Sequence, residues 1–247
     1  MIKLTDRLKS IAKELTAGES MADIGTDHGF LPLYLWENSI SPFVIMTDIN
    51  EGPIEIVKEN CRRLHPYFDF DIRKGNGLEP LEKDEVYTVV IAGMGGMLIS
   101  DILAADMEKS RSFMKYVLQP RSKRGYLRHF LSTNGFLIKK EKLVREGGYI
   151  CSIITAVPDD EYVLPDELKC HDCDSVAWEI PHNINRKNSL YEEYLVGIYN
   201  KEADIYRKMK KGMTGDEKGL EKQMDRIRYM KKVLDDERYF YDDCFTD

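Results

Sequence analysis

The chain has 247 residues, with 36 Lys and Arg against 43 Asp and Glu, which gives a formal net charge of −7. Hydrophobic residues at 43% and charged residues at 32% are typical of a globular protein and exclude collagen, low complexity and intrinsic disorder for the bulk of the chain. The longest uncharged stretch begins at Val86, carries three glycines and is too short to span a membrane. This length allows one large domain, or one ordinary domain with a smaller appendage.

The N-terminal segment predicts an amphipathic helix, because Leu4, Leu8, Ile11 and Leu15 fall at helical spacing. Charged residues interrupt the apolar positions, so a secretory signal peptide is not expected. The five cysteines are Cys61, Cys151, Cys170, Cys173 and Cys244. Because this set is odd in number and scattered, it does not suit a disulfide framework. We expect a reduced, soluble, cytoplasmic protein.

Strand and helix patterns alternate from Met21 onward. The predicted strands of the alternating region are 21–24, 44–46, 68–72, 86–92 and 116–118. The predicted helices follow residue 29 and cover 54–64 and about 122–132. Two further strands, 136–143 and 149–157, flank a hairpin turn at 145–148. These elements predict an α/β, Rossmann-like, seven-stranded sheet with one reversed strand and a ligand site at the carboxyl ends of its parallel strands.

Composition changes after Val157, where prolines and acidic residues indicate a linker. Helical patterns resume near Ser189, stop at the glycines between 212 and 215, and resume again from 216 to about 236. In the second of these segments Leu220, Ile227 and Leu234 repeat every seven residues, with Met230 between them. We therefore predict a domain at 1–158, and a linker with a coiled-coil-like antiparallel helical hairpin at 159–247.

The turn after the first strand reads Asp23-Ile24-Gly25-Thr26-Asp27-His28-Gly29. Glycine-rich turns at this place commonly bind nucleotides, although a plain tight turn gives the same pattern. A dinucleotide would bring its diphosphate to the position of Asp27, whose carboxylate would repel it. S-adenosylmethionine lacks phosphate and carries a positive sulfonium, so this turn favours it over a dinucleotide.

Asp48 ends the second predicted strand, 23 residues after Gly25. An acidic side chain at this point accepts hydrogen bonds from ribose hydroxyls in nucleoside-binding sheets. The alternative is a turn aspartate that caps the following helix.

An ordered series of motifs then suggests a family. The series is Asp23-Ile24-Gly25-Thr26-Asp27-His28 with Leu31-Pro32, Asp48-Ile49-Asn50 with Gly52-Pro53, Gly75-Asn76-Gly77-Leu78, Ile91-Ala92-Gly93-Met94-Gly95-Gly96, and Leu118-Gln119-Pro120. Over about residues 1–157 the chain resembles the bacterial tRNA (adenine-22-N1)-methyltransferase family, which is S-adenosylmethionine-dependent and has a C-terminal helical extension.

The resemblance implies roles for individual residues. The implied S-adenosylmethionine-binding residues are Arg7, Asp23, Gly25, Thr26, Gly29, Asp48, Ile49, Asn76, Gly77 and Gly93. The implied catalytic residues are Asp27, Met94 and Gly95. The family usually has Asp in the position of Asn76, where it contacts the cofactor adenine, so we expect weaker but retained binding. For Arg7 the alternative is a solvated helix arginine.

The Gly93–Gly96 segment also bears on the target atom. Methyltransferases that act on exocyclic amines commonly carry Asn/Asp-Pro-Pro-aromatic at this place, and its absence favours a ring nitrogen. Adenine N1 has an available lone pair, lies on the Watson–Crick edge, and must be unpaired or flipped out to react. Asp27 could stabilise the positive charge that methylation creates, unless it is only a helix N-cap. His28 could orient phosphate or base, or could be a simple surface histidine.

Charge is unevenly distributed. Nine Lys or Arg and one acid lie between Lys115 and Arg145, whereas eight acids and one lysine lie between Pro158 and Glu179. We expect the basic stretch, in particular Arg121, Lys123 and Arg124, to bind RNA phosphates together with the lysine-rich hairpin. Solvated surface charge is the alternative. The hairpin could instead serve homodimerisation, which is compatible with RNA binding, and no obligate protein partner is evident.

Two rival functions remain. A methyltransferase of the same fold acting on a small molecule or a protein would be insensitive to neutralisation of Arg121, Lys123 and Arg124. A non-catalytic RNA-binding protein would bind RNA without transferring a methyl group.

Cys170 and Cys173, with His182, form half a zinc site at most, so no metal is expected.

Overall fold

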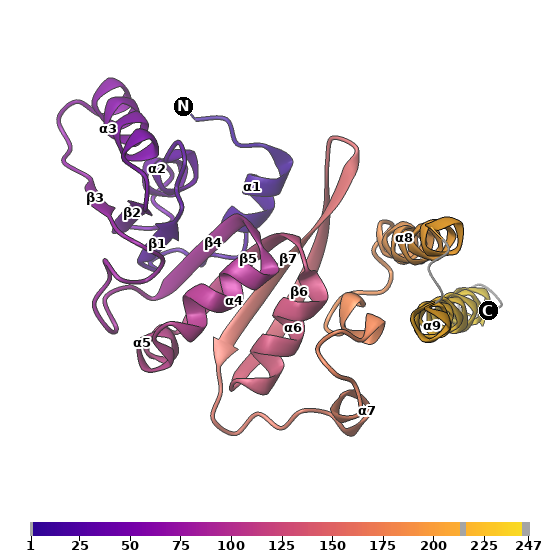
Figure 1. Ribbon diagram of the computed structural model, residues 1–247. Coiled ribbons are helices and arrows are strands. Elements are labelled where there is room, and N and C mark those ends of the chain that lie inside the picture. The colour runs from indigo at the N-terminus through magenta and orange to yellow at the C-terminus, as the bar shows by residue number, and fades with distance from the viewer. Residues whose placement is uncertain (1, 213–215, 244–247) are drawn as a thin grey trace.

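A sheet of seven strands runs through the middle of the molecule (Figure 1). The structure is a computed structural model that describes residues 2–212 and 216–243, with side chains as far as residue 236. The strands are β1 (Met21–Ile24), β2 (Val44–Asp48), β3 (Asp71–Lys74), β4 (Thr88–Gly95), β5 (Lys115–Ser122), β6 (Phe136–Glu146) and β7 (Tyr149–Pro158). Their order across the sheet is β3-β2-β1-β4-β5-β7-β6.

The pairing of the strands confirms the predicted topology. Strands β3, β2, β1, β4 and β5 are parallel, and β7 is antiparallel to both of its neighbours, so β7 is the one reversed strand. Strands β1 and β2 and the first half of β4 are mostly apolar, and almost every residue in them is buried. Such strands need helices on both faces, because each face presents side chains that must leave water.

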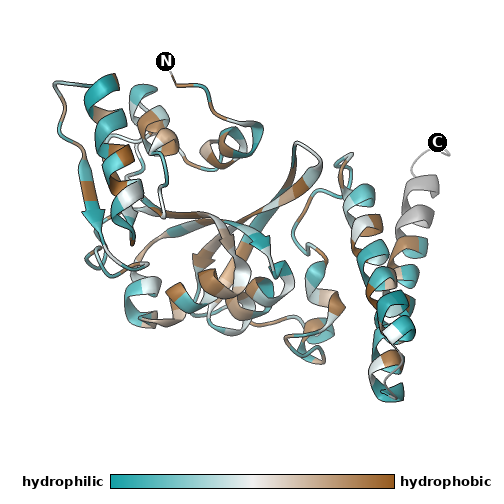
Figure 2. Ribbon diagram, turned by 45° about the horizontal axis from the view of Figure 1, so that its top comes forward, coloured by the Kyte–Doolittle hydropathy of each residue, from teal (hydrophilic) through white to brown (hydrophobic). Residues whose placement is uncertain are grey.

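Helices cover both faces of the sheet (Figure 1). One face carries α1 (Asp6–Ala12), α2 (Phe30–Glu37) and α3 (Glu51–Leu64), and the other carries α4 (Gly96–Ala104), α5 (Met107–Ser112) and α6 (Arg124–Thr133). Two separate apolar clusters fill the spaces between the layers, as the hydropathy colouring indicates (Figure 2). Helices α4 and α5 were not among the predicted elements, and α5 is short and rich in charged and polar residues.

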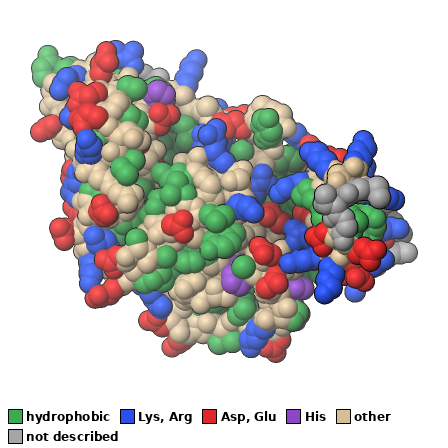
Figure 3. All heavy atoms as spheres, in the orientation of Figure 1, with side chains coloured by type: hydrophobic (Ala, Val, Ile, Leu, Met, Phe, Trp, Pro, Cys, Tyr) green, Lys and Arg blue, Asp and Glu red, His purple; other side chains and the backbone are tan. Residues whose placement is uncertain are grey.

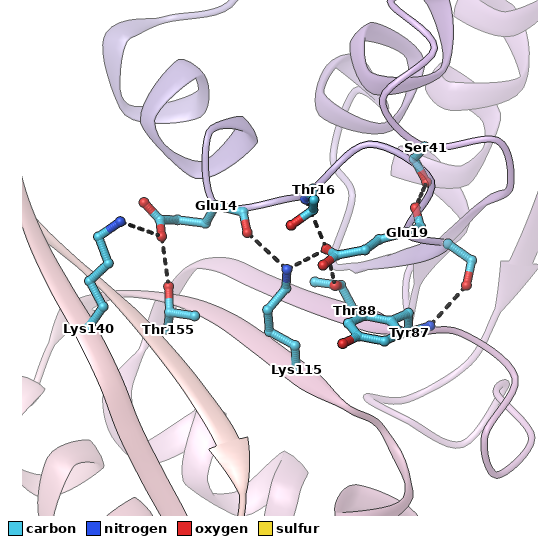
Figure 4. A network of polar contacts seen from close by, with 10 residues as sticks. Glu14, Thr16, Glu19, Ser41, Tyr87, Thr88, Lys115, Lys140 and Thr155 are labelled. Carbon is cyan, nitrogen blue, oxygen red and sulfur yellow. Dashed lines mark hydrogen bonds and ion pairs between the residues drawn. The ribbon is translucent and has the colours of Figure 1, made fainter.

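A polar network ties the amino-terminal edge of the sheet together (Figure 4). The ammonium group of Lys115 pairs with Glu19 and donates to the backbone oxygen of Glu14 at 3.0 Å. The Glu14 carboxylate in turn pairs with Lys140 and Lys142. The side chain of Lys115 is only 12% exposed. Its inclusion among the RNA-facing basic residues is therefore wrong, because its charge is satisfied inside the protein on the edge opposite the predicted site.

The C-terminal part contains α7 (Asp166–Lys169), the 3-10 helix η1 (Val176–Glu179), α8 (Tyr191–Gly212) and α9 (Glu217–Asp243). Helices α8 and α9 lie side by side, which confirms the helical hairpin (Figures 1 and 2). Met230 of the predicted seam is fully buried against α8, and Glu202 of α8 accepts from Gln223 of α9 at 2.7 Å. Residues 213–215 of the predicted turn lie outside the described residues.

Part of the segment predicted as a linker is packed rather than free. Val176, Ala177 and Trp178 of η1 are buried, and Trp178 has no exposed side-chain surface. They pack beside α6 and at the start of α8 (Figure 1). This part of the chain therefore connects the sheet to the helical hairpin through a buried contact.

Candidate active site

The residues singled out in the sequence gather at one edge of the sheet. Ile24 of β1 is aligned with Thr47 of β2 and Ile91 of β4, so the carboxyl ends of these parallel strands lie at the same edge of the sheet. The backbone amides of Gly25 and Thr26 both donate to the carbonyl of Thr47, at 2.8 and 2.9 Å. The segments at the carboxyl ends of β1 to β4 are 25–29, 48–50, 75–77 and 93–96. We call this place the carboxyl edge.

The turn between β1 and α2 has three residues in left-handed conformations. Gly25, Asp27 and Gly29 have φ values of 74°, 46° and 71°. A Cβ atom on Gly25 would lie 2.2 Å from Cε of Met94, so glycine permits the close approach of β4 to this turn. Helix α2 starts after Gly29 and receives no side-chain cap. Asp27 is therefore not a helix N-cap.

Asp27 and His28 form the outer part of this turn. The Asp27 side chain is 73% exposed, and its Oδ2 lies 3.5 Å from Nε2 of His28. The His28 ring stacks on Phe30 with centroids 5.4 Å apart. The two polar groups thus stand at the mouth of the turn, where they can meet a large ligand.

Asp23 and Arg7 lie beneath the turn. Burial raises the pKa of the Asp23 carboxyl to about 6, the nearby Asp48 carboxylate adds to this shift, and the Thr26 hydroxyl and Arg7 guanidinium oppose it. Arg7 donates from Nε to Glu146 at 2.6 Å and from Nη1 to Gln119 at 3.1 Å. Arg7 is thus held by the protein, which excludes the solvated-helix alternative.

The raised pKa of Asp23 predicts a pH-dependent stability. Because the folded state holds this proton more tightly than the unfolded chain does, the Asp23 contribution is fully present below about pH 4 and is lost as pH rises through about 6. The loss amounts to at most about 3 kcal/mol of unfolding free energy. Urea unfolding from pH 4 to pH 7 should show this decline in the wild type relative to Asp23→Asn. Parallel pH profiles of the two proteins would contradict it.

Gln119 and Glu146 were not predicted as site residues. Gln119 is 1% exposed and directs its amide oxygen at Arg7. The Glu146 pKa is lowered, because hydrogen bonds from Thr5 and Arg7 outweigh the opposing effect of burial. The Leu118-Gln119-Pro120 motif was the only sequence signal for Gln119, and Glu146 had none, because its partner lies 139 residues away.

Asp48 is the last residue of β2, and Asn76 follows the end of the neighbouring strand β3. Oδ1 of Asp48 accepts from the backbone amide of Asn50 at 2.8 Å, but Asp48 does not cap α3, whose N-cap is Asn50. Ile49 beside it is 54% exposed. Asn76 is exposed in the loop after β3, and Gly77 next to it has φ 54°. The two polar side chains therefore remain at the open surface of the carboxyl edge.

The Gly93–Gly96 segment differs from its prediction. Strand β4 was expected to end at Ala92 and instead continues to Gly95, with a register irregularity around Met94 that lets it pair with Pro120 and Ser122 of β5. Gly93 has φ 81°, and a Cβ atom there would meet nothing within 4 Å. The backbone is therefore open at Gly93 and closely packed at Gly96, where a Cβ atom would lie 2.2 Å from the carbonyl oxygen of Lys123.

A cleft of about 530 Å³ opens between the sheet and α8. It is lined by Arg121, Lys123 and Arg124, by the β6–β7 turn at Gly148 and Tyr149, and by Tyr194 and Lys201 of α8. We call it the α8 cleft. Lys and Arg side chains gather along this junction (Figure 3).

The walls of the α8 cleft are fixed by two contacts. The Arg124 guanidinium lies 5.3 Å from the ring centroid of Tyr194, and Arg145 pairs with Glu193. In the part of the chain that has described side chains, Arg121 and Lys123 are exposed and form no ion pair. Their charges are available to a polyanion.

Among the described residues, no group of three or more His, Cys, Asp or Glu could hold a metal ion. Cys61, Cys151, Cys170 and Cys173 are free thiols, and Cys244 lies outside the described residues. Within the same residues, every helix is too short or too polar to cross a bilayer.

Comparisons with known proteins agree with this geometry. A family model described as a methyltransferase domain matches residues 4–154. The tRNA (adenine(22)-N(1))-methyltransferase of Bacillus subtilis is 27% identical over 236 residues, covering 95% of this chain and 98% of that protein.

Solved structures extend the likeness to the whole fold. The crystal structure of the B. subtilis m1A22 tRNA methyltransferase TrmK is 25% identical, with a TM-score of 0.79 over 95% of this chain and 100% of that one. The structure of M. capricolum TrmK in complex with S-adenosylhomocysteine is also 25% identical, with a TM-score of 0.74 over 94% and 98% of the two chains.

Proposed function

The chain belongs to the methyltransferase-domain family, and we propose that it is an S-adenosylmethionine-dependent enzyme that methylates N1 of adenine 22 in tRNA. The observation that carries this proposal is the match with the B. subtilis enzyme of that name over nearly the full length of both chains. The match includes the carboxyl edge and the helical hairpin. A small-molecule methyltransferase would share the first of these features and would not need the second.

The carboxyl edge has the features that S-adenosylmethionine requires. Asp48 would accept hydrogen bonds from the ribose hydroxyls, and the side-chain oxygen of Asn76 would accept one from the adenine amino group. Buried Asp23 and the fixed guanidinium of Arg7 present opposite charges to the amino-acid end of the cofactor. The remaining proposed contacts come from backbone or uncharged side chains: Gly25, Thr26, Gly29, Ile49, Gly77 and Gly93. When bound, S-adenosylmethionine supplies a methyl group that its sulfonium activates.

The protein's own task is mainly to align the adenine. N1 has a lone pair near neutral pH, so no strong base is needed, and an in-line approach at roughly 3–3.5 Å supplies much of the acceleration. We assign this alignment to Met94 and Gly95, where β4 approaches the β1 turn. Asp27 stands at the mouth of that turn and would stabilise the positive charge of the methylated ring. His28 beside it would contact the RNA.

We further propose that Arg121, Lys123 and Arg124 bind tRNA phosphates along the α8 cleft. Arg128 does not belong to that set, because its side chain is completely buried. The division of the chain at residue 158, the end of β7, separates the methyl-transfer part from the RNA-binding hairpin. A cytoplasmic location follows from a tRNA substrate.

Methylation of defined transcripts tests the function. Purified protein with labelled S-adenosylmethionine should label an unmodified tRNA transcript carrying A22, and nucleoside digestion should give 1-methyladenosine. The same transcript with A22 replaced by G is the matched control and should remain unlabelled. Label in another nucleoside, or equal label in the control, would refute the target. Binding of tRNA without any label would favour the non-catalytic alternative.

A further inference from the structure

A buried ion pair lies between the sheet and the C-terminal part. Nε of Arg128 on α6 lies 2.8 Å from Oε2 of Glu141 on β6, and neither side chain has any exposed surface. Arg128 also donates from Nη2 to the hydroxyl of Ser152 on β7 at 3.2 Å. A fully buried charge pair is stable only where its remaining polar atoms are hydrogen-bonded as well. Here most of those remaining bonds go to the C-terminal part.

The bonds from this pair cross to the segment 178–183. Nη1 of Arg128 donates to the carbonyls of Trp178 and Glu179, both at 3.0 Å. Oε1 of Glu141 accepts from the backbone amide of His182 at 3.1 Å, and the Glu141 amide donates to the carbonyl of Asn183 at 2.7 Å. The ion pair therefore holds η1 and the residues after it against α6 and β6. We call Arg128 and Glu141 the clamp.

A bulge in β6 places Glu141 in the clamp. The register of β6 against β7 shifts between Ile138 and Lys140. Phe136 and Ile138 are buried before the shift, and Glu141 and Leu143 after it, so one extra residue moves Glu141 onto the face that α6 covers. A regular strand would have placed Lys140 there. The bulge is thus the reason that the Glu141 side chain points into the protein.

The clamp also fixes the first turn of α8. The hydroxyl of Tyr194 donates to the Glu179 carbonyl at 3.2 Å, the same oxygen that Arg128 binds. Tyr194 forms one wall of the α8 cleft, opposite Arg124, which precedes Arg128 by one helical turn. The two walls of the cleft are therefore joined through the clamp.

The start of α6 lies against the carboxyl edge. Gly95 is paired with Ser122, and Gly96 lies against the carbonyl of Lys123, the residue before α6. One ten-residue helix thus contacts the Gly93–Gly96 segment at its start and the clamp within its second turn. The first two turns of α6 therefore set the distance between the carboxyl edge and the helical hairpin.

We propose that Arg128 and Glu141 are positioning residues that fix the helical hairpin beside the sheet at the α8 cleft, and thereby align bound RNA with the methyl-transfer site. This inference rests on the proposed function. Neither residue contacts substrate or cofactor. Losing the clamp should release segment 176–184 and α8 together, while the sheet and the cofactor-binding turns keep their structure.

The test replaces both charges with apolar side chains of similar length. Arg128→Met/Glu141→Met leaves no unpaired buried charge between α6 and β6. The carbonyls of Trp178 and Glu179 and the amide of His182 lose their partners, which favours separation of this segment from the sheet. We expect the KM for tRNA to rise about tenfold, because the hairpin must be ordered on binding. The KM for S-adenosylmethionine should stay within about twofold, and small-angle X-ray scattering should show a more extended molecule.

The matched control is Lys115→Met/Glu19→Met, which removes a mostly buried ion pair at the opposite edge of the sheet. It should lower the melting temperature without changing the KM for tRNA or the scattering profile. An unchanged KM for tRNA and an unchanged profile in the clamp variant would overturn the proposal. So would an equal rise in KM for tRNA in both variants, since that would indicate a general loss of stability.

If the clamp variant does not fold, the wild-type enzyme provides the decisive measurement. Hydrogen exchange at the amides of Glu141 and His182 should be as slow as in β7, and exchange as fast as in an open loop would overturn the proposal. Failure of the proposed function is distinguishable, because a wild type that methylates no tRNA would still show the protected amides and the clamp-dependent scattering.

Discussion

Gly25→Ala should weaken binding of S-adenosylhomocysteine by about 100-fold, measured by titration calorimetry. Gly25 has φ 74°, and an added Cβ would lie 2.2 Å from Cε of Met94. Either Met94 moves into the space beside the turn, or the turn moves away from β4. Movement of Met94 relieves the contact, because Cε is the far end of a flexible side chain, but it leaves alanine strained at φ 74°. Relief of that strain displaces the Gly25–Gly29 backbone from the cofactor that we assign to it.

Gly18→Ala is the matched control for this variant. Gly18 has φ 96°, so alanine there suffers the same kind of backbone strain, but nothing lies within 4 Å of its Cβ position. The residue lies in the turn before β1, at the other edge of the sheet. Both variants should lose stability through strain of roughly 1–2 kcal/mol, and only Gly25→Ala should lose the ligand. Equal affinities in the two would place the cofactor away from this turn.

The parallel strands could be predicted from the sequence because each is marked by residues that are adjacent in the chain. Residues 21–24 and 86–92 are apolar runs bounded by turn residues, and they form β1 and most of β4. The carboxyl edge follows from topology alone, since parallel strands end together. Gly25, Asp48, Asn76 and Gly93 were thus placed correctly relative to one another before their geometry was known.

The C-terminal half of β4 and the docking of the hairpin depend on distant partners. Gly93–Gly95 read as a loop, and they continue the strand because Pro120 and Ser122 of β5 accept the shifted register. Arg128 was interpreted as a surface charge, one of the basic residues expected to bind RNA. It lies three residues before Leu131 on the buried face of α6, which is the one local sign of its position. Its partner Glu141 faces it only because of the bulge in β6, and the amino-acid composition gives no sign of that bulge.

Arg7 illustrates the same limit within the site. Its helix was predicted, but a charged residue in an amphipathic helix is ordinarily solvated. Its hydrogen bonds to Gln119 and Glu146 join α1 to β5 and to the end of β6, over 112 and 139 residues of sequence. Such contacts appear only once the sheet brings its strand ends together.

Gly96→Ala should lower the rate of methyl transfer about 100-fold while cofactor affinity changes little. A Cβ atom on Gly96 would lie 2.2 Å from the Lys123 carbonyl oxygen and 2.9 Å from its carbon. These are backbone atoms, so no rotamer change relieves the contact, and the start of α4 must move from the start of α6 by about 1 Å. A misplacement of that size at a reacting centre can reduce the rate by about two orders of magnitude.

The split between rate and affinity follows from where the cofactor contacts lie. Most of the proposed cofactor contacts, among them Asp48, Asn76 and Gly25, belong to the β1–β3 side of the carboxyl edge. Gly93 lies on β4 with open space beside it, whereas Gly96 joins β4 to α4 and packs against the residue before α6. Single-turnover kinetics and calorimetry measure the two effects separately. Gly52→Ala is the control, since it adds the same methyl group to an exposed helical position with nothing within 4 Å. A rate for Gly96→Ala equal to that of Gly52→Ala would mean that the packing of α4 against α6 does not govern the alignment of the target base.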